Sequence, residues 1–268
     1  MEFGEYVERQ RSIVAALVAL LLRMLWPFRA TKMTESGWLS LLRVMYPEVE
    51  RARRESAALA RRFYDSQRAL YVGTDDRWDV DLAPYKFEWF EEAMRPSKRA
   101  VMAEEASEGV ISQAVLRAVK EVENGGRRTL LRPVTDPERR DPVVKGWARV
   151  ATGRETCAFC LMLVSRGPVY FSAEDAGLDL DDTSALELID EGNNEALQEA
   201  MKRWHPGCDC KVVPVFDRKR WPGRDAYLEA EKLWIEATRG HRGRDALNAL
   251  RRAIESGEVD PRDIAAAA

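Results

Sequence analysis

Apolar positions recur every three or four residues along the first half of the chain, and this spacing predicts amphipathic helices. The predicted helices cover residues 13–25, 35–45, 47–71, 87–95 and 97–126. Pro47 is expected at the first position of its helix, where a missing N–H costs little. Gly125 and Gly126 are expected just past the end of the last helix, where glycine often terminates one.

The first of these helices is apolar on every side. Its run from Ile13 to Leu22 is interrupted by Arg23. Even extended to Phe28, the run is shorter than the ~20 residues that a membrane span requires. Glutamates precede it and no small-residue cleavage site follows, which disfavours a signal peptide. We expect a helix buried on all sides against the core or a partner, and a membrane or signal segment is the alternative.

The helix over residues 47–71 combines an apolar stripe with a basic face. The stripe consists of Val49, Ala52, Leu59, Phe63 and Leu70. The arginines that lie largely off this stripe are Arg51, Arg53, Arg54, Arg61 and Arg62. We expect a solvated face, and contact with phosphates or an acidic partner is the alternative.

The pattern changes in the second half of the chain. Pro133, Pro137 and Pro142 mark the best boundary. Short elements follow from Trp147, then an acidic, loop-like spacer with a possible helix over residues 195–204. The run "CKVVPVF" favours a strand, and Pro214 places it at a sheet edge. Residues 218–254 return to helix in two pieces, and the final "IAAAA" is expected to fray.

These patterns predict a mainly α fold. A long helical N-terminal region (residues 1–132) precedes a small α+β Cys/His module with short strands (145–216) and a helical C-terminal tail (217–268). The 268 residues are 32% charged and 46% hydrophobic, with a net charge of −3, which is ordinary for a soluble chain with a core. The charge balance excludes a global attraction for nucleic acid. Four cysteines are too few for a disulfide-dense secreted module, so we expect an intracellular protein with reduced thiols.

The candidate chemistry lies in two short blocks. Cys157 and Cys160 form a C-x2-C pair in "TCAFC", and Cys208 and Cys210 form a C-x-C pair in "WHPGCDC", where His205 precedes Pro206-Gly207. Zinc favours thiolate and imidazole and takes four ligands in a tetrahedron, so four of the five candidates would form a structural site. Four thiolates, or three thiolates with the imidazole, are both open. Buried thiols without metal, or two disulfides, are the alternative.

Enzyme signatures are missing from the sequence. A zinc deaminase would show H-x-E and P-C-x-x-C. A Cys-His hydrolase would need an activated thiolate beside a histidine; only His205 and His241 are available, and His205 is better explained by its cysteine neighbours. No P-loop or nucleophile elbow is present, and the carboxylates Glu174, Asp175 and Asp179 to Asp182 are typical of a solvated loop. We therefore expect no catalytic residue and no enzyme; a metal-dependent nuclease or toxin is the weaker alternative.

The two blocks together resemble the MuF-like minor capsid proteins of tailed bacteriophages, in their actinobacteriophage form. The resemblance covers residues 145–216 and rests on Arg149, Thr152, Gly153, Cys157, Cys160, His205, Pro206, Cys208, Cys210 and Pro214. One departure is Asp209, at a position that is basic in many relatives.

The resemblance implies a structural role without catalysis. Such a protein lies inside the phage head, after assembly in the host cytoplasm, in several copies per particle. It would bind the portal protein or the major capsid protein, and it would aid head assembly and DNA packaging or delivery. Contact with packaged DNA is a further expectation, a nucleic-acid-binding module is the alternative function, and no membrane span is expected.

Overall fold

The computed structural model describes the chain except for residues 30–31, 74–76, 79–83, 104–105, 137, 154–155, 171–203, 209 and 267–268. It forms two compact units. The first comprises Met1–Ser66, Asp79–Thr129 and His205–Gly207, and the second comprises Gln67–Trp78, Leu130–Trp204 and Cys208–Ala268. Two long helices contribute residues to both units.

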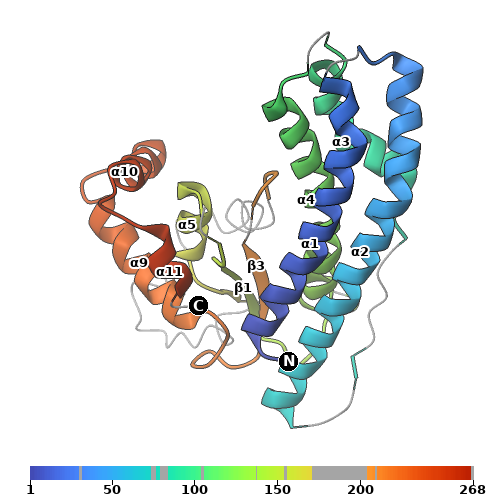
Figure 1. Ribbon diagram of the computed structural model, residues 1–268. Helices are drawn as coiled ribbons and strands as arrows, with labels where there is room; N and C mark the ends of the chain where they lie inside the picture. Colours follow the sequence, from blue (N-terminus) through green and yellow to red (C-terminus); the bar gives the residue numbers. More distant parts are fainter. Residues whose placement is uncertain are drawn as a thin grey trace. The chain divides into compact units, whose positions relative to one another are not determined.

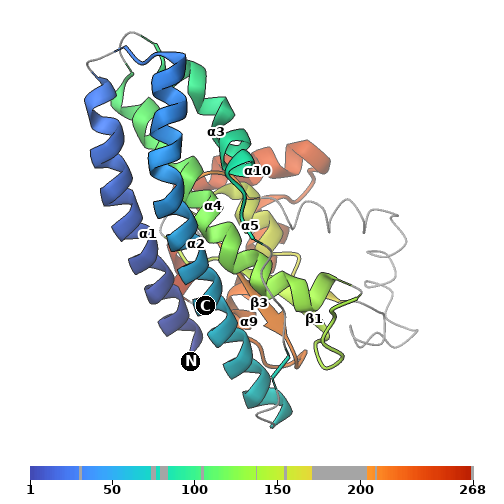
Figure 2. The same cartoon turned by 90° about the vertical axis from the view of Figure 1, so that its right-hand side faces the viewer.

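Long helices build the first unit. They are α1 (Phe3–Leu25), followed by the 3-10 turn η1 (Trp26–Arg29), then α2 (Glu35–Val72), α3 (Phe87–Val101) and α4 (Glu108–Thr135). Figures 1 and 2 show α1 and α2 side by side and running in opposite directions, with α4 alongside them. Their shared core includes Leu21 from α1, Leu42 and Met45 from α2, Phe90 from α3 and Val122 from α4.

Two prolines that were expected to limit helices lie inside them. Pro47 lies within α2, which is one continuous helix where two were predicted, and Pro96 lies within α3. The buried stripe explains both cases. Burial at Phe90, Met94, Ser97 and Val101 follows helical spacing past the exposed Pro96. Packing of a continuous apolar stripe thus outweighs the hydrogen bond that each proline removes.

The prediction that Gly125 and Gly126 end a helix is wrong, because α4 continues through both to Thr135. Neither glycine has a positive φ. Their function is close packing. A Cβ at Gly125 would lie 2.7 Å from the backbone oxygen of Arg53, and one at Gly126 would lie 2.8 Å from Ser56 Oγ. The missing side chains let α4 approach α2 closely.

The first helix is buried on one face only, which corrects the prediction of burial on all sides. Its buried stripe includes Leu17, Leu21 and Leu25, while Ala16 and Ala19 are exposed. By length and composition, Phe3–Arg29 would also be able to cross a membrane. Only 17% of its most apolar 18-residue window is buried. A core helix of a soluble protein passes the same test, so this is weak evidence for a span.

The face of α2 also differs from the prediction at two places. Leu70, expected in the apolar stripe, is 67% exposed. Arg53, expected on the solvated face, is buried, donates a hydrogen bond to the carbonyl oxygen of Glu121 and stacks on Tyr85. Other arginines pair with acids one turn away, since Arg51 lies 2.7 Å from Glu48 and Arg54 lies 2.8 Å from Glu50. Such pairs partly neutralise the basic face.

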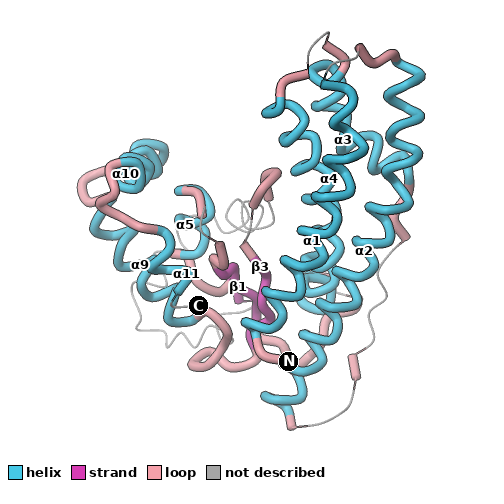
Figure 3. The backbone as a smooth tube through the Cα atoms, viewed as in Figure 1, coloured by secondary structure: helices cyan, strands magenta, loops and turns pink. Residues whose placement is uncertain are grey.

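The second unit contains a small antiparallel sheet. Strand β1 (Gly146–Val150) lies between β2 (Val169–Tyr170) and β3 (Lys211–Val215). Figure 3 shows that strands form a much smaller part of the structure than helices do. Among the described strands β3 is at an edge, which confirms the position inferred from Pro214. Every residue of β1 and β3 is buried. Neither strand therefore shows the alternation of buried and exposed residues that is typical of a sheet with one face in solvent.

Helices complete the second unit. They are α5 (Ala158–Val164), α9 (Arg224–Ala237), α10 (Gly243–Glu255) and α11 (Pro261–Ala266). Their core includes Leu161, Ala226, Leu250 and Ile264. The end of the chain was predicted to fray from residue 264, but α11 is helical through Ala266 because Ile264 is fully buried.

The mainly α fold class is confirmed. The three-part division at residues 132, 145 and 217 stays a prediction. The helix proposed over residues 195–204 and the spacer carboxylates lie outside the described residues, apart from Trp204.

Candidate metal centre

The C-x2-C block forms the beginning of α5. Cys157 is the N-cap, with φ −70° and ψ 159°, and its sulfur accepts a hydrogen bond from the Cys160 amide at 3.5 Å. Cys160 is the third residue of the helix, and its amide is one of the first-turn N–H groups that have no partner within the helix. The spacing therefore brings both sulfurs to the same end of α5.

The C-x-C block leads directly into β3. Cys208 and Cys210 occupy alternate positions just before the strand, and alternate side chains of an extended chain point to the same side. Gly207, which ends the predicted Pro-Gly turn, has a φ of +81°, a conformation that favours glycine. The turn was expected from the sequence.

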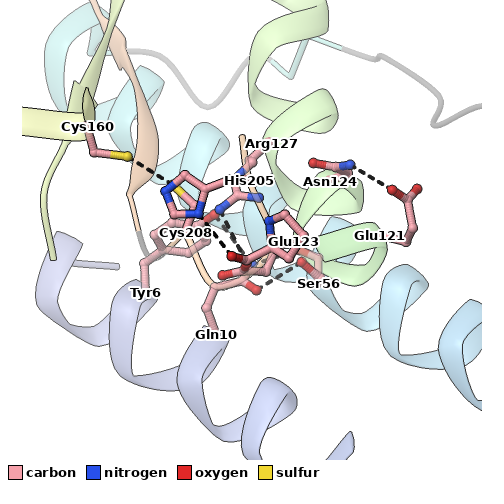
Figure 4. Close-up of polar contacts among 11 residues, drawn as sticks. Tyr6, Gln10, Ser56, Glu121, Glu123, Asn124, Arg127, Cys160, His205 and Cys208 are labelled. Atoms are coloured by element: carbon pink, nitrogen blue, oxygen red, sulfur yellow. Dashed lines mark hydrogen bonds and ion pairs between the residues drawn. The ribbon is translucent and has the colours of Figure 1, made fainter. Parts of the chain in front are cut away.

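The two blocks meet in one buried cluster. Cys160 Sγ lies 3.4 Å from Cys208 Sγ (Figure 4), and the sulfur atoms of Cys160, Cys208 and Cys210 all lie within 4.8 Å of one another. None of the four cysteines forms a disulfide. In a tetrahedral zinc thiolate the sulfurs lie ~3.8 Å apart, given Zn–S bonds of ~2.3 Å. The observed separations suit a shared metal ion.

Cys160 is the central member of this cluster. Hydrogen bonding with Cys157 raises the pKa of its thiol above the ordinary value of 9.0, and hydrogen bonds with Cys208 and Cys210, together with burial, raise it further. Crowded sulfurs resist becoming several adjacent anions. A divalent cation would reverse that preference, because thiolates are the form that binds metal.

Trp204 packs against the cysteine cluster and is partly buried. Above its ring lies the guanidinium of Arg149, with Cζ 4.4 Å from the ring centroid. Sequence reasoning noted Arg149 only as part of a motif. The signal that it missed was a single cation in the otherwise apolar strand "GWARV".

The remaining candidate ligand, His205, is exposed, and its Nδ1 lies 2.9 Å from the carbonyl oxygen of Pro206. An Nδ1–H that donates to this oxygen would leave Nε2 as the unprotonated nitrogen. The buried cluster itself is formed by Cys160, Cys208 and Cys210, with Cys157 packed against it. Asp209, between the two C-x-C sulfurs, lies outside the described residues.

A second polar group in Figure 4 belongs to the first unit and serves packing. Gln10 Nε2 donates to the backbone oxygen of Ser56 at 3.1 Å, and Ser56 Oγ donates back to Gln10 Oε1 at 2.9 Å. Nearby on α4, Arg127 and Glu123 form a buried pair at 3.3 Å. Reciprocal hydrogen bonds of this kind satisfy buried polar atoms where α1, α2 and α4 approach each other.

A family model described as VG15 protein matches residues 2–237. The chain belongs to the VG15 protein family. The Gene 15 protein of Mycobacterium phage L5 is 40% identical to this VG15 family member over 296 aligned residues, which cover 100% of both chains. The Gene 15 protein of Mycobacterium phage D29 is 39% identical over 279 residues, which cover 96% of this VG15 chain and 100% of the relative. No solved structure matches.

The likeness therefore extends over nearly the whole VG15 chain, including both units and both cysteine blocks. It supports a bacteriophage protein of the actinobacteriophage type.

Proposed function

We propose that this VG15 family member is a minor structural protein of the phage head, of the MuF-like kind. It acts at the portal or capsid interior and aids head assembly and DNA packaging or delivery. One observation carries the proposal: the two motif blocks that resemble MuF-like proteins meet in a single buried cluster, with Cys160 and Cys208 in sulfur contact. A buried contact that joins two distant segments of the chain in this way is in keeping with a structural protein.

The exposed face of α1 adds support for an assembled state. Ala16 and Ala19 are exposed on a helix whose other side is buried at Leu17, Leu21 and Leu25. Exposed alanines between charged residues leave room for a partner to pack against this side of α1. The portal protein and the major capsid protein are the partners that the proposal names.

The test is the composition of purified particles from a phage that encodes this chain. Mass spectrometry should detect the protein in procapsids and mature heads at a small number of copies relative to the major capsid protein. Co-expression with the portal protein should give a complex on size-exclusion chromatography. Absence from both particle types, together with a monomer that ignores portal and capsid proteins, would reject the proposal.

We further propose that the cysteine cluster holds a structural zinc ion. Cys160, Cys208 and Cys210 supply three thiolates, and either Cys157 or His205 supplies the fourth ligand. Thiolate and imidazole ligands select zinc over magnesium or calcium. Zinc would then hold the start of α5 to the start of β3 without taking part in catalysis.

Elemental analysis of protein purified under reducing conditions tests the metal. About one zinc per chain supports the site. Cobalt substitution then identifies the fourth ligand, because Cys157→Ser and His205→Ala change the thiolate-to-cobalt absorption differently. Loss of this absorption in Cys157→Ser names Cys157, whereas a shift of the cobalt d–d bands in His205→Ala, with the thiolate absorption kept, names His205. Protein that folds with four titratable thiols and no metal would refute the site.

A further inference from the structure

Arg149 is a buried cation in the middle strand of the second unit's sheet. Only 1% of it is exposed, which makes it one of the largest fully buried side chains among the described residues. A guanidinium keeps its proton under all ordinary conditions. Burial of such a charge is unfavourable unless nearby negative charge compensates it.

The sheet register places Arg149 on the same face as the thiol cluster. Arg149 in β1 lies opposite Val212 in β3, and side chains of directly opposed residues share a face. Cys210 is two residues before Val212 along the extended chain, so its side chain points to that face too. Diagonal neighbours of this kind have Cα atoms ~7–8 Å apart.

Trp204 provides the second link between Arg149 and the sulfurs. The guanidinium stacks 4.4 Å from the indole centroid, and the same indole packs against the cluster of Cys160, Cys208 and Cys210. Stacking fixes the orientation of the planar guanidinium. Strand register and ring stacking are independent observations, and both place the buried guanidinium of Arg149 beside the cysteine cluster.

The charge of a loaded site would match this arrangement. Zinc carries two positive charges, so three thiolates leave an excess of one negative charge and four leave an excess of two. We propose that Arg149 is a positioning residue of this centre, whose guanidinium, held on Trp204, balances the excess negative charge of the zinc–thiolate group. The inference rests on the zinc site proposed above, and it holds whether the fourth ligand is Cys157 or His205.

Zinc affinity of the reduced full-length chain tests this role, measured by competition with a chromophoric chelator. Arg149→Met keeps the length of the side chain and removes its charge, and we expect its zinc affinity to fall at least tenfold. Arg149→Lys restores the charge and should recover most of that loss. Arg166→Met is the matched control, because Arg166 stacks on Trp234 at 4.6 Å in the same unit, and its affinity should equal that of the wild type.

Two substitutions of Trp204, on which the guanidinium stacks, test the same role if Arg149→Met does not fold. Trp204→Phe keeps an aromatic face under the guanidinium and should bind zinc almost as tightly as the wild type. Trp204→Leu removes that face and should bind more weakly. Circular dichroism at saturating zinc confirms that each compared variant is folded.

The outcomes separate the two proposals. If the wild type binds no zinc, the metal centre itself is wrong. If the wild type binds zinc and Arg149→Met binds it equally well, only the role of Arg149 is overturned. Equal loss in Arg149→Met and Arg149→Lys would show that shape and not charge matters, and this result also overturns the inference.

Discussion

The sulfur atoms of Cys160 and Cys208 lie 3.4 Å apart, although 48 positions separate the two residues in the chain. One belongs to the first turn of α5 and the other to the segment that leads into β3. The first predictions concern this pair.

Replacement of Cys160 should remove the metal and weaken the fold. Cys160 is hydrogen-bonded to the three other thiols and belongs to both proposed ligand sets, so Cys160→Ser disrupts either one. We expect almost complete loss of bound zinc and a fall in the free energy of unfolding of at least ~2 kcal/mol. Zinc analysis and urea unfolding measure both effects. Met162→Leu, a volume-conserving change on the same helix, should leave them unchanged; retention of zinc in Cys160→Ser would contradict the assignment.

The metal-free protein should lose stability in alkali. The folded-state pKa of Cys160 lies above its ordinary value of 9.0 because neighbouring thiols and burial disfavour the thiolate. Below the unfolded-state pKa both states keep the proton, and this contribution to stability is complete. Above it the unfolded chain releases a proton that the folded chain holds, so the free energy of unfolding falls by up to ~1.4 kcal/mol per pH unit.

Urea unfolding of reduced, chelator-treated protein between pH ~7.5 and ~9.5 measures this slope. The zinc-loaded protein should lack it, because its thiols have already lost their protons, and it should instead release zinc in acid. Metal-free Cys160→Ser provides the control and should show a smaller slope. Equal slopes in both metal-free proteins would exclude Cys160 as the cause.

Gly125→Ala should destabilise the first unit even though alanine is the better helix former. The new methyl group would lie 2.7 Å from the backbone oxygen of Arg53, a contact that only helix displacement relieves. We expect a loss of ~1–3 kcal/mol from overpacking, which exceeds the ~1 kcal/mol gained in helix propensity. Gly109→Ala in the same helix meets only Ser107 Oγ at 3.8 Å and should be neutral or stabilising. Urea midpoints compare the two; the opposite ranking would disprove close packing at Gly125.

Two substitutions that each place a glutamate on α1 should distinguish a role of this helix in assembly from its role in folding. Ala19 is exposed, so Ala19→Glu should change the free energy of unfolding by less than ~0.5 kcal/mol. If the exposed apolar face binds the portal or capsid, this variant should still fold but should fail to enter phage heads. Leu21 is fully buried, and Leu21→Glu should unfold the first unit. Normal incorporation of Ala19→Glu would remove this face from the proposed interface.

Local patterns predicted much of the fold and the site. The mainly α class followed from helical spacing, the edge position of β3 from Pro214, and the convergence of Cys208 with Cys210 from their alternation. Each of these features depends on residues that lie close together in the sequence. The residue types and their spacing therefore sufficed to predict them.

The errors arose where distant packing decides the structure. Pro47 was read as a helix start because its missing N–H is a local property, but the buried stripe continues past it. Gly125 was read as a helix end because its use in close packing depends on Arg53, which is far away in the chain. The sequence did not predict the environment of Arg149, because that environment is formed by a strand partner and by the ring of Trp204, 55 positions later (204 − 149).

The sulfur cluster also closes a loop in the covalent chain. Once Cys160 and Cys208 share a metal, the ends of the segment between them are fixed to each other whatever its length. The cost of closing such a loop grows only with the logarithm of its length, by ~0.6 kcal/mol for each doubling. Changes in the length of this segment that spare α5, β2 and Trp204 should therefore cost the rest of the protein little stability.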